Sequence, residues 1–137
     1  MGIEALSRGA AEAIFIEIST KCLRTIKENL ERTSLSNRAA VLKGDALRIL
    51  RRLGRQGRKF DLVIADPPYE VKKSSERKPS LAQKTLKALV ESAILRANSV
   101  VVLEHSEKEA GLQVAAGLSL LSVKKYGGTA VSIFRPS

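Results

Sequence analysis

The sequence predicts an α/β fold in which a mostly parallel sheet is covered by helices. Short apolar runs alternate with amphipathic stretches along the 137 residues, which is the order of elements in such folds. Most of these runs are continuously apolar, as expected for strands buried on both faces. A glycine pair between the last two runs, Gly127 and Gly128, indicates a closing antiparallel hairpin.

Six apolar runs have the length and composition of strands. Each is short and rich in Val, Ile, Leu or Ala, and turn residues bound several of them. The third run is cut off by two prolines, which cannot continue a central strand. We expect strands at 13–18, 39–42, 60–65, 99–104, 118–125 and 129–134.

Stretches with helical periodicity separate these runs. A short helix is expected at 2–7, and a second follows Ser19 or Thr20, either of which can cap it. A basic helix then turns leucines inward and arginines outward, and a fourth helix begins at Ser80. The remaining signals are Gly54 and Gly57, which end the basic helix, and a capping-box pattern at 106–109 before a further short helix.

The charge favours a polyanion as partner. Lys and Arg number 24 against 14 Asp and Glu, a net charge of +10. The excess gathers at 43–59 and at 72–78, beside the motif described below. A solvated face that keeps the protein soluble is the alternative explanation. The candidate RNA-binding residues are Arg48, Arg51, Arg52, Arg55, Lys72 and Lys73.

Several classes of protein are excluded by composition. A single cysteine, Cys22, and a single histidine, His105, exclude an internal disulfide framework and a Cys- or His-built metal centre. No metal site is expected, and His105, just beyond a strand end, is expected to be a surface or capping residue. The apolar runs are far shorter than the roughly 18 residues that span a bilayer. We expect a single domain, 1–137, in the cytoplasm and without a membrane partner.

The most specific motif is Asp66-Pro67-Pro68-Tyr69, at the carboxyl end of the third predicted strand. This pattern suits methylation of an exocyclic amino group, whose nitrogen is a poor nucleophile because its lone pair is delocalised into the base. The carboxylate of Asp66 and the carbonyl of Pro67 would accept the two N–H bonds. The prolines fix the backbone, and Tyr69 would stack on a flipped base. A strand that simply ends in a Pro-Pro turn is the alternative.

Glu17 is a candidate for binding a ribose. In doubly wound folds an acid that holds a ribose lies about 20 residues beyond a glycine-rich loop. Glu17 ends the first predicted strand, and counting back from it runs off the front of the chain. An exposed acid at a strand end is the alternative.

The chain resembles the bacterial 16S rRNA guanine-N2 methyltransferase family, which has a Rossmann-like class I methyltransferase fold. The matching stretches run in order along nearly the whole chain. They are 2–10, the strand ending in Glu17, 28–30, 44–46, 60–69 and 126–129.

The resemblance implies S-adenosylmethionine as cofactor and 16S rRNA, or a small ribosomal subunit particle, as substrate. It implies that Glu17 binds the cofactor's ribose and that Asp45 and the backbone of Ala46 contact its adenine. Asp66 would border the cofactor and, with Pro67, Pro68 and Tyr69, hold the target guanine. Asp45 acting only as a helix N-cap is the alternative for that residue.

The chain departs from the family at its start. Family members have a β-hairpin extension, a strand and a glycine-rich loop before the segment that begins here at Gly2. We therefore expect an N-terminally truncated form, a sheet without its usual first strand, and weak or no activity. Either the 13–18 and 60–65 strands close up directly, or self-association covers the missing central strand.

Two other functions remain open from the sequence. The same motif serves adenine-N6 and other amino methyltransferases. A non-catalytic, basic RNA-binding domain also fits the charge.

Overall fold

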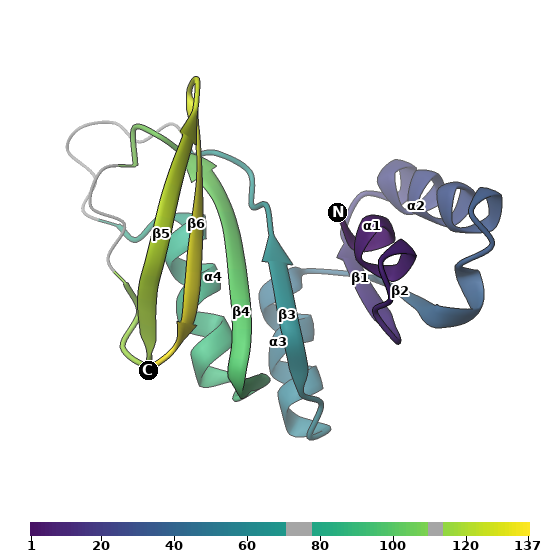
Figure 1. Ribbon diagram of the computed structural model, residues 1–137, viewed down its shortest axis with the longest axis horizontal. Coiled ribbons are helices and arrows are strands. Elements are labelled where there is room, and N and C mark those ends of the chain that lie inside the picture. The colour runs from purple at the N-terminus through teal and green to yellow at the C-terminus, as the bar shows by residue number, and fades with distance from the viewer. Residues whose placement is uncertain (71–77, 110–113) are drawn as a thin grey trace. The chain divides into compact units, whose positions relative to one another are not determined.

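The structure, a computed structural model, describes residues 1–70, 78–109 and 114–137. The chain divides into two compact units, Met1–Ile49 and Leu50–Ser137. All six expected strands are present. They form a two-stranded sheet in the first unit, in the order β1-β2, and a four-stranded sheet in the second, in the order β3-β4-β6-β5 (Figure 1).

The first unit is a parallel strand pair with two helices. Its elements are α1 (Gly2–Ser7), β1 (Ala13–Glu17), α2 (Thr20–Arg32), a 3₁₀ turn (Ser36–Arg38) and β2 (Ala39–Lys43). β1 and β2 pair in register from Ala13 and Ala39 to Glu17 and Lys43.

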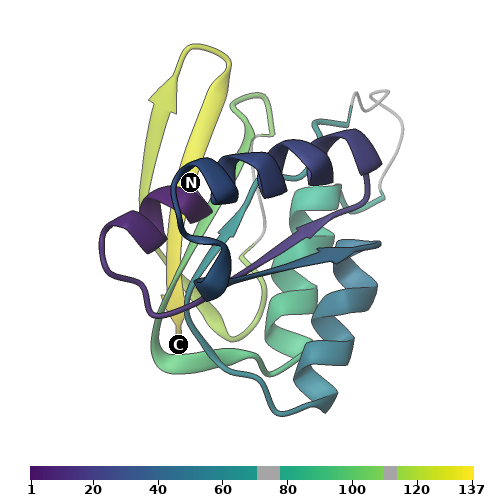
Figure 2. The same cartoon turned by 90° about the vertical axis from the view of Figure 1, so that its right-hand side faces the viewer.

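Both helices of this unit pack on one apolar core (Figure 2). Leu6 of α1 and Leu30 of α2 are almost completely buried there, against Phe15 of β1 and Val41 of β2. The guanidinium of Arg38 donates to the carbonyl oxygens of Ala10, at 2.8 Å, and Leu6, at 3.2 Å. Charged hydrogen bonds therefore fix the end of α1 beside the start of β2.

The second unit is a mixed sheet covered by α4. Its elements are β3 (Phe60–Ala65), α4 (Leu81–Glu91), β4 (Leu95–Ser106), β5 (Leu118–Tyr126) and β6 (Thr129–Pro136). β3 and β4 are parallel, whereas β4–β6 and β5–β6 are antiparallel. α3 (Ala46–Arg55) crosses the boundary between the units.

The core of the second unit lies between α4 and the sheet. Leu86 and Leu89 of α4 are buried, as are Val101 and Leu103 of β4 and Phe134 of β6. The buried positions of β4 alternate from Ser99 to His105, as a strand with one face against a core requires. A complete capping box begins α4, with Ser80 and Gln83 bonding each other's backbone amides.

α3 approaches the end of α4 very closely at Gly54. A Cβ built at this position would lie 2.1 Å from the carbonyl oxygen of Ser92. Gly54 therefore belongs inside the helix, where no side chain fits, and does not end it as expected. Gly57, at φ +71°, ends α3 in the left-handed conformation that glycine favours.

The expected single, mostly parallel sheet is corrected to two sheets, the larger of them mixed. Among the strands described, β1 pairs with β2 alone and β3 with β4 alone, so none is the shared neighbour of β1 and β3. Direct pairing of β1 with β3, one of the two expected alternatives, is not observed among the described strands. In the described part of the chain, no helix is both long and apolar enough to span a bilayer.

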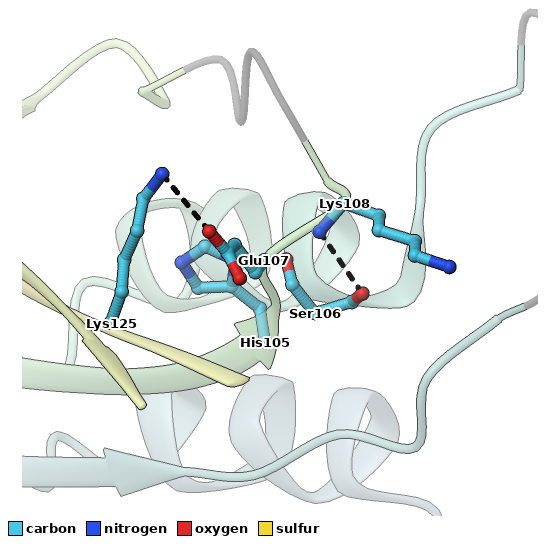
Figure 3. Close-up of polar contacts among 5 residues, drawn as sticks. All are labelled: His105, Ser106, Glu107, Lys108 and Lys125. Atoms are coloured by element: carbon cyan, nitrogen blue, oxygen red, sulfur yellow. Dashed lines mark hydrogen bonds and ion pairs between the residues drawn. The ribbon is translucent and has the colours of Figure 1, made fainter. Parts of the chain in front are cut away.

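The expected helix start at 106–109 is also corrected. Ser106 ends β4, and the backbone turns back at Glu107 and Lys108, where the Lys108 amide donates to Ser106 Oγ at 3.3 Å (Figure 3). The hydroxyl therefore closes a tight turn rather than capping a helix. Residues 110–113 lie outside the described part of the chain.

Candidate active site

Asp66 follows the last residue of β3, at the carboxyl edge of the larger sheet. The parallel register pairs Ala65 of β3 with Leu103 of β4, so Asp66 begins the motif beside the position that Glu104 occupies. Pro67 and Pro68 then carry the chain out of the sheet, because proline cannot donate to a strand ladder. The expected motif therefore lies where ligands usually bind in open α/β sheets.

Two residues from other strands hold the hydroxyl of Tyr69. Its Oη lies 2.9 Å from Thr129 Oγ1 of β6 and 3.3 Å from Glu104 Oε1 of β4. Because a phenol has one proton and a carboxylate only accepts, Tyr69 donates to Glu104, and Thr129 donates to Tyr69. The Tyr69 side chain stays 47% exposed, which leaves aromatic surface available for stacking.

The carboxyl of Asp66 is harder to ionise than an ordinary aspartate. Partial burial raises its pKa, and the negative charge of Glu104 raises it further. A carboxylate in this environment gains from hydrogen-bond donors, since they compensate for both effects. The site is therefore electrostatically suited to a neutral ligand group that carries N–H bonds.

The end of β4 is held by polar contacts on its other face. His105 is 6% exposed, and its ring nitrogens lie 2.8 Å from Ser132 Oγ and 3.0 Å from the carbonyl oxygen of Ser106. The carbonyl requires a proton on Nδ1, so in the neutral ring Nε2 accepts from Ser132. His105 is thus a buried structural residue, which corrects its expected place on the surface.

A surface ion pair adds to this attachment. Lys125 Nζ of β5 lies 3.3 Å from Glu107 Oε1, just beyond the end of β4 (Figure 3). The contacts of His105, Glu107 and Lys125 connect the end of β4 to both strands of the hairpin. Glu104 is therefore presented from a well-supported strand end.

In the first unit, Glu17 is oriented by the backbone at the end of β1. Its Oε1 accepts from the amides of Ile18, at 2.8 Å, and Ser19, at 2.9 Å. The amide of Gly44, after β2, donates to the carbonyl of Glu17 at 3.1 Å. A carboxylate held at a strand end in this way fits the paired hydroxyls of a ribose, since each hydroxyl donates one hydrogen bond.

Asp45 and Ala46 stand at the start of α3. The amide of Arg48 donates to Asp45 Oδ1 at 2.9 Å, so Asp45 does cap this helix. Gly44, at φ +151°, makes the turn into it, and a Cβ there would lie 3.1 Å from Ile49 Cδ1. The N-cap role does not use the second carboxylate oxygen of Asp45. This first unit therefore offers the donors and acceptors that a nucleoside needs.

The candidate RNA-binding arginines lie exposed along α3. Arg48, Arg51, Arg52 and Arg55 point away from the core, while Ile49, Leu50 and Leu53 are buried. In the described part of the chain, none of the four arginines pairs with a carboxylate. Lys72 and Lys73, the other two candidates, lie outside the described residues.

Sequence reasoning missed Glu104 and Thr129. They lie 35 and 60 residues beyond Tyr69, and only strand register brings them to the motif. A partial signal was present for Glu104, since it ends an apolar run as Asp66 does. Parallel strands place such residues at the same edge of a sheet.

Comparison with solved structures places this fold in a known class. A candidate methylase from Haemophilus influenzae superposes with a TM-score of 0.82 at 26% identity, over 98% of this chain and 78% of that one. A methyltransferase from Podospora anserina, solved with S-adenosylhomocysteine, has the same fold at 15% identity and a TM-score of 0.65, over 92% of this chain and 61% of that one. The fold is an α/β methyltransferase-like fold.

The family is shown by sequence. The model of the family described as conserved hypothetical protein 95 matches residues 1–135, and the chain belongs to this family. A candidate rRNA methyltransferase of Bacillus subtilis, YlbH, is 31% identical over 98% of this chain and 69% of its own length. Ribosomal RNA small subunit methyltransferase D of Haemophilus influenzae is 30% identical over 93% of this chain and 61% of its own length.

These relatives confirm the resemblance to small-subunit rRNA methyltransferases. The chain spans 69% of YlbH, 61% of the Haemophilus influenzae enzyme and 51% of ribosomal RNA small subunit methyltransferase D of Buchnera aphidicola.

Proposed function

We propose that this chain takes part in S-adenosylmethionine-dependent methylation of the exocyclic N2 amino group of a guanine in small-subunit rRNA, with the weak or absent activity that the sequence predicts. The observation that carries the proposal is the motif at the end of β3, with Tyr69 fixed by Glu104 and Thr129. The family relationship supports rRNA as the substrate class. We further propose that the two units are parts of one methyltransferase domain.

Asp66 and Pro67 would prepare the amino group. The carboxylate of Asp66 accepts a hydrogen bond from one N–H of the amino group, and the carbonyl of Pro67 accepts one from the other N–H. These two hydrogen bonds draw the nitrogen lone pair out of conjugation with the ring. Tyr69 stacks on the base, a contact worth roughly 1–3 kcal/mol. Catalysis then depends mainly on position and electrostatics.

The first unit would bind the cofactor, which supplies an activated methyl group on a sulfonium. Glu17 is suited to the ribose hydroxyls, and Asp45 and the Ala46 backbone to the adenine. On the second unit, the proton that N2 loses as it is methylated passes from the nitrogen to the Asp66 carboxylate or to water. The exposed arginines of α3 would neutralise RNA phosphates.

The test is transfer of labelled methyl groups to 16S rRNA and to small ribosomal subunit particles, with identification of the modified base. Asp66→Ala should abolish transfer. The matched control is Asp61→Ala, an exposed acid on β3 that pairs with Arg96. A measurable rate for Asp66→Ala that equals the rate of the unsubstituted chain would overturn the site, and a product other than N2-methylguanine would overturn the substrate.

A further inference from the structure

Glu104 and Asp66 are presented side by side on one face of the sheet. Ile64 of β3 pairs with Val102 of β4, and Asp66 and Glu104 each lie two residues further on. Since side chains on a strand alternate between faces with a period of two, both carboxylates leave the sheet on the same side. The bond from Tyr69 to Glu104 shows that Glu104 faces the motif.

The carboxylate of Glu104 has capacity left for a ligand. One oxygen, Oε1, accepts from Tyr69, whereas an ionised carboxylate can accept about four hydrogen bonds over two oxygens. Within the described residues Glu104 forms no ion pair, so no cation neutralises it. An acceptor of this kind beside Asp66 would be most stable against a second N–H donor.

Only one common RNA base presents two adjacent donors of that kind. The pairing edge of guanine carries N1–H next to the N2 amino group. Adenine and cytosine instead present an amino group next to an unprotonated ring nitrogen. The lone pair of that nitrogen would repel the lone pairs of the second carboxylate. A pair of carboxylates therefore selects guanine and disfavours the other two amino-bearing bases.

We propose that Glu104 is the specificity-determining residue of this site, accepting the N1–H of the guanine whose N2 amino group donates to Asp66. The proposal rests on the function proposed above. Tyr69 connects stacking with base recognition, because its ring stacks on the base and its hydroxyl holds Glu104. Thr129, in turn, positions Tyr69.

Binding of nucleotides to the full chain tests this role without requiring activity. The probes are guanosine 5′-monophosphate and the 5′-monophosphate of 2-aminopurine riboside, which keeps the 2-amino group but has an acceptor at N1. Dissociation constants come from amide shifts of the ¹⁵N-labelled protein. We expect the guanine nucleotide to bind about tenfold more tightly, the effect of one charge-assisted hydrogen bond.

The variant that isolates Glu104 is Glu104→Gln. It retains an acceptor for Tyr69, but its amide can also donate to the N1 of 2-aminopurine. The tenfold preference should therefore largely disappear, whereas Glu107→Gln, at the first residue after the end of β4, should retain it. Because 2-aminopurine also lacks the guanine O6, the informative quantity is the change in preference between variants.

The outcomes separate the two proposals. If Asp66→Asn weakens binding of the guanine nucleotide but Glu104→Gln leaves the preference unchanged, the role of Glu104 is overturned and the proposed site stands. If the unsubstituted chain binds both nucleotides equally, the role of Glu104 is likewise overturned. If it binds neither nucleotide, or binds them independently of Asp66, both proposals fail.

Discussion

Tyr69 is a side chain whose position depends on residues far away in the sequence. Its ring follows a Pro-Pro turn, but its hydroxyl is held by Thr129 and Glu104 on two other strands. Without these bonds the exposed ring would sample several rotamers, and the stacking surface would not be preorganised.

Replacing Tyr69 by Phe keeps the ring and removes both bonds. We expect methyl transfer to slow by about tenfold, since one or two hydrogen bonds of ordinary net strength position the ring. Initial rates with labelled cofactor and small-subunit rRNA measure this effect. Tyr126→Phe, at the exposed hairpin end, is the matched control and should be neutral. Equal rates for the two variants would show that the bonds do not position the ring.

The raised pKa of Asp66 predicts that replacing this residue stabilises the protein, and that the gain depends on pH. Its pKa is raised in the folded state, so ionisation opposes folding at pH values above that pKa, and this cost disappears below the pKa of the unfolded chain. Asp66→Asn should therefore raise the melting temperature at pH 7, and the gain should shrink towards pH 3. Thermal unfolding followed by circular dichroism at several pH values measures it.

The control for this measurement is Asp61→Asn. Asp61 pairs with Arg96 at 3.2 Å and is exposed, so its substitution should give no gain at pH 7. A gain for Asp66→Asn that is independent of pH would contradict the electrostatic cause.

For single residues, the sequence predicted which side chains carry the chemistry more accurately than it predicted the contacts that these side chains make. Asp66, Pro67, Pro68 and Tyr69 could be recognised because they are contiguous. The burial of His105 could also have been predicted, because it continues the alternation of Val101 and Leu103. The contacts of Glu104 and Thr129 could not, because they depend on the register of three strands.

Among the elements, α3 is constrained by its contact with the end of α4. Gly54→Ala would place a methyl group 2.1 Å from the carbonyl oxygen of Ser92, so the helix must shift. We expect a loss of about 1–3 kcal/mol in the free energy of unfolding, as for other overpacked sites. Denaturant titration measures it.

Gly128→Ala is the control, since nothing lies within 4 Å of the added carbon there. A stability equal to that of the unsubstituted chain for Gly54→Ala would show that the two helices can separate without cost.

The outer face of α3 predicts the salt dependence of RNA binding. Each phosphate contact contributes about 0.7–0.9 to the slope of log K against log salt concentration. Replacing Arg51, Arg52 and Arg55 together by Ala should flatten this slope by about 2. Filter binding of 16S rRNA at several salt concentrations measures it.

A charge-matched control comes from α2, where Lys21, Arg24 and Lys27 are also exposed. Their triple substitution should change the slope less than that of the α3 arginines. An unchanged slope for the α3 variant would mean that its arginines form only a solvated face.

Strands and helices were predicted more accurately than their pairing. The strand that ends at Ala65 and the helix that starts after Ser80 are where periodicity and capping residues indicated. The pattern at 106–109 was misleading, because a serine hydroxyl can close a turn as readily as it can cap a helix. The division into two sheets depends on which strands are neighbours, and periodicity does not contain that information.

At the scale of the whole molecule, the two units differ in the size of their cores. Five hydrophobic residues are buried in the first unit and twelve in the second, among those described. The first unit therefore has less apolar burial to oppose local opening.

Hydrogen exchange should reveal this difference. We expect the amides of β1 and β2 to exchange faster than those of β4 and β6, and to open below the free energy of global unfolding. Exchange measured by NMR or mass spectrometry under native conditions checks this order. Identical opening free energies in both units would show that the chain unfolds as one cooperative body.

The attachment of Tyr69 has a consequence for redesign. Because its hydroxyl is fastened to β4 and β6, the angle of the aromatic platform is set by the sheet and not by the motif alone. Substitutions at Thr129 can therefore reorient the stacking surface while the Asp66-Pro67-Pro68-Tyr69 sequence stays intact. Libraries made at this one position would vary how a base is seated and leave the groups that hold its amino nitrogen unchanged.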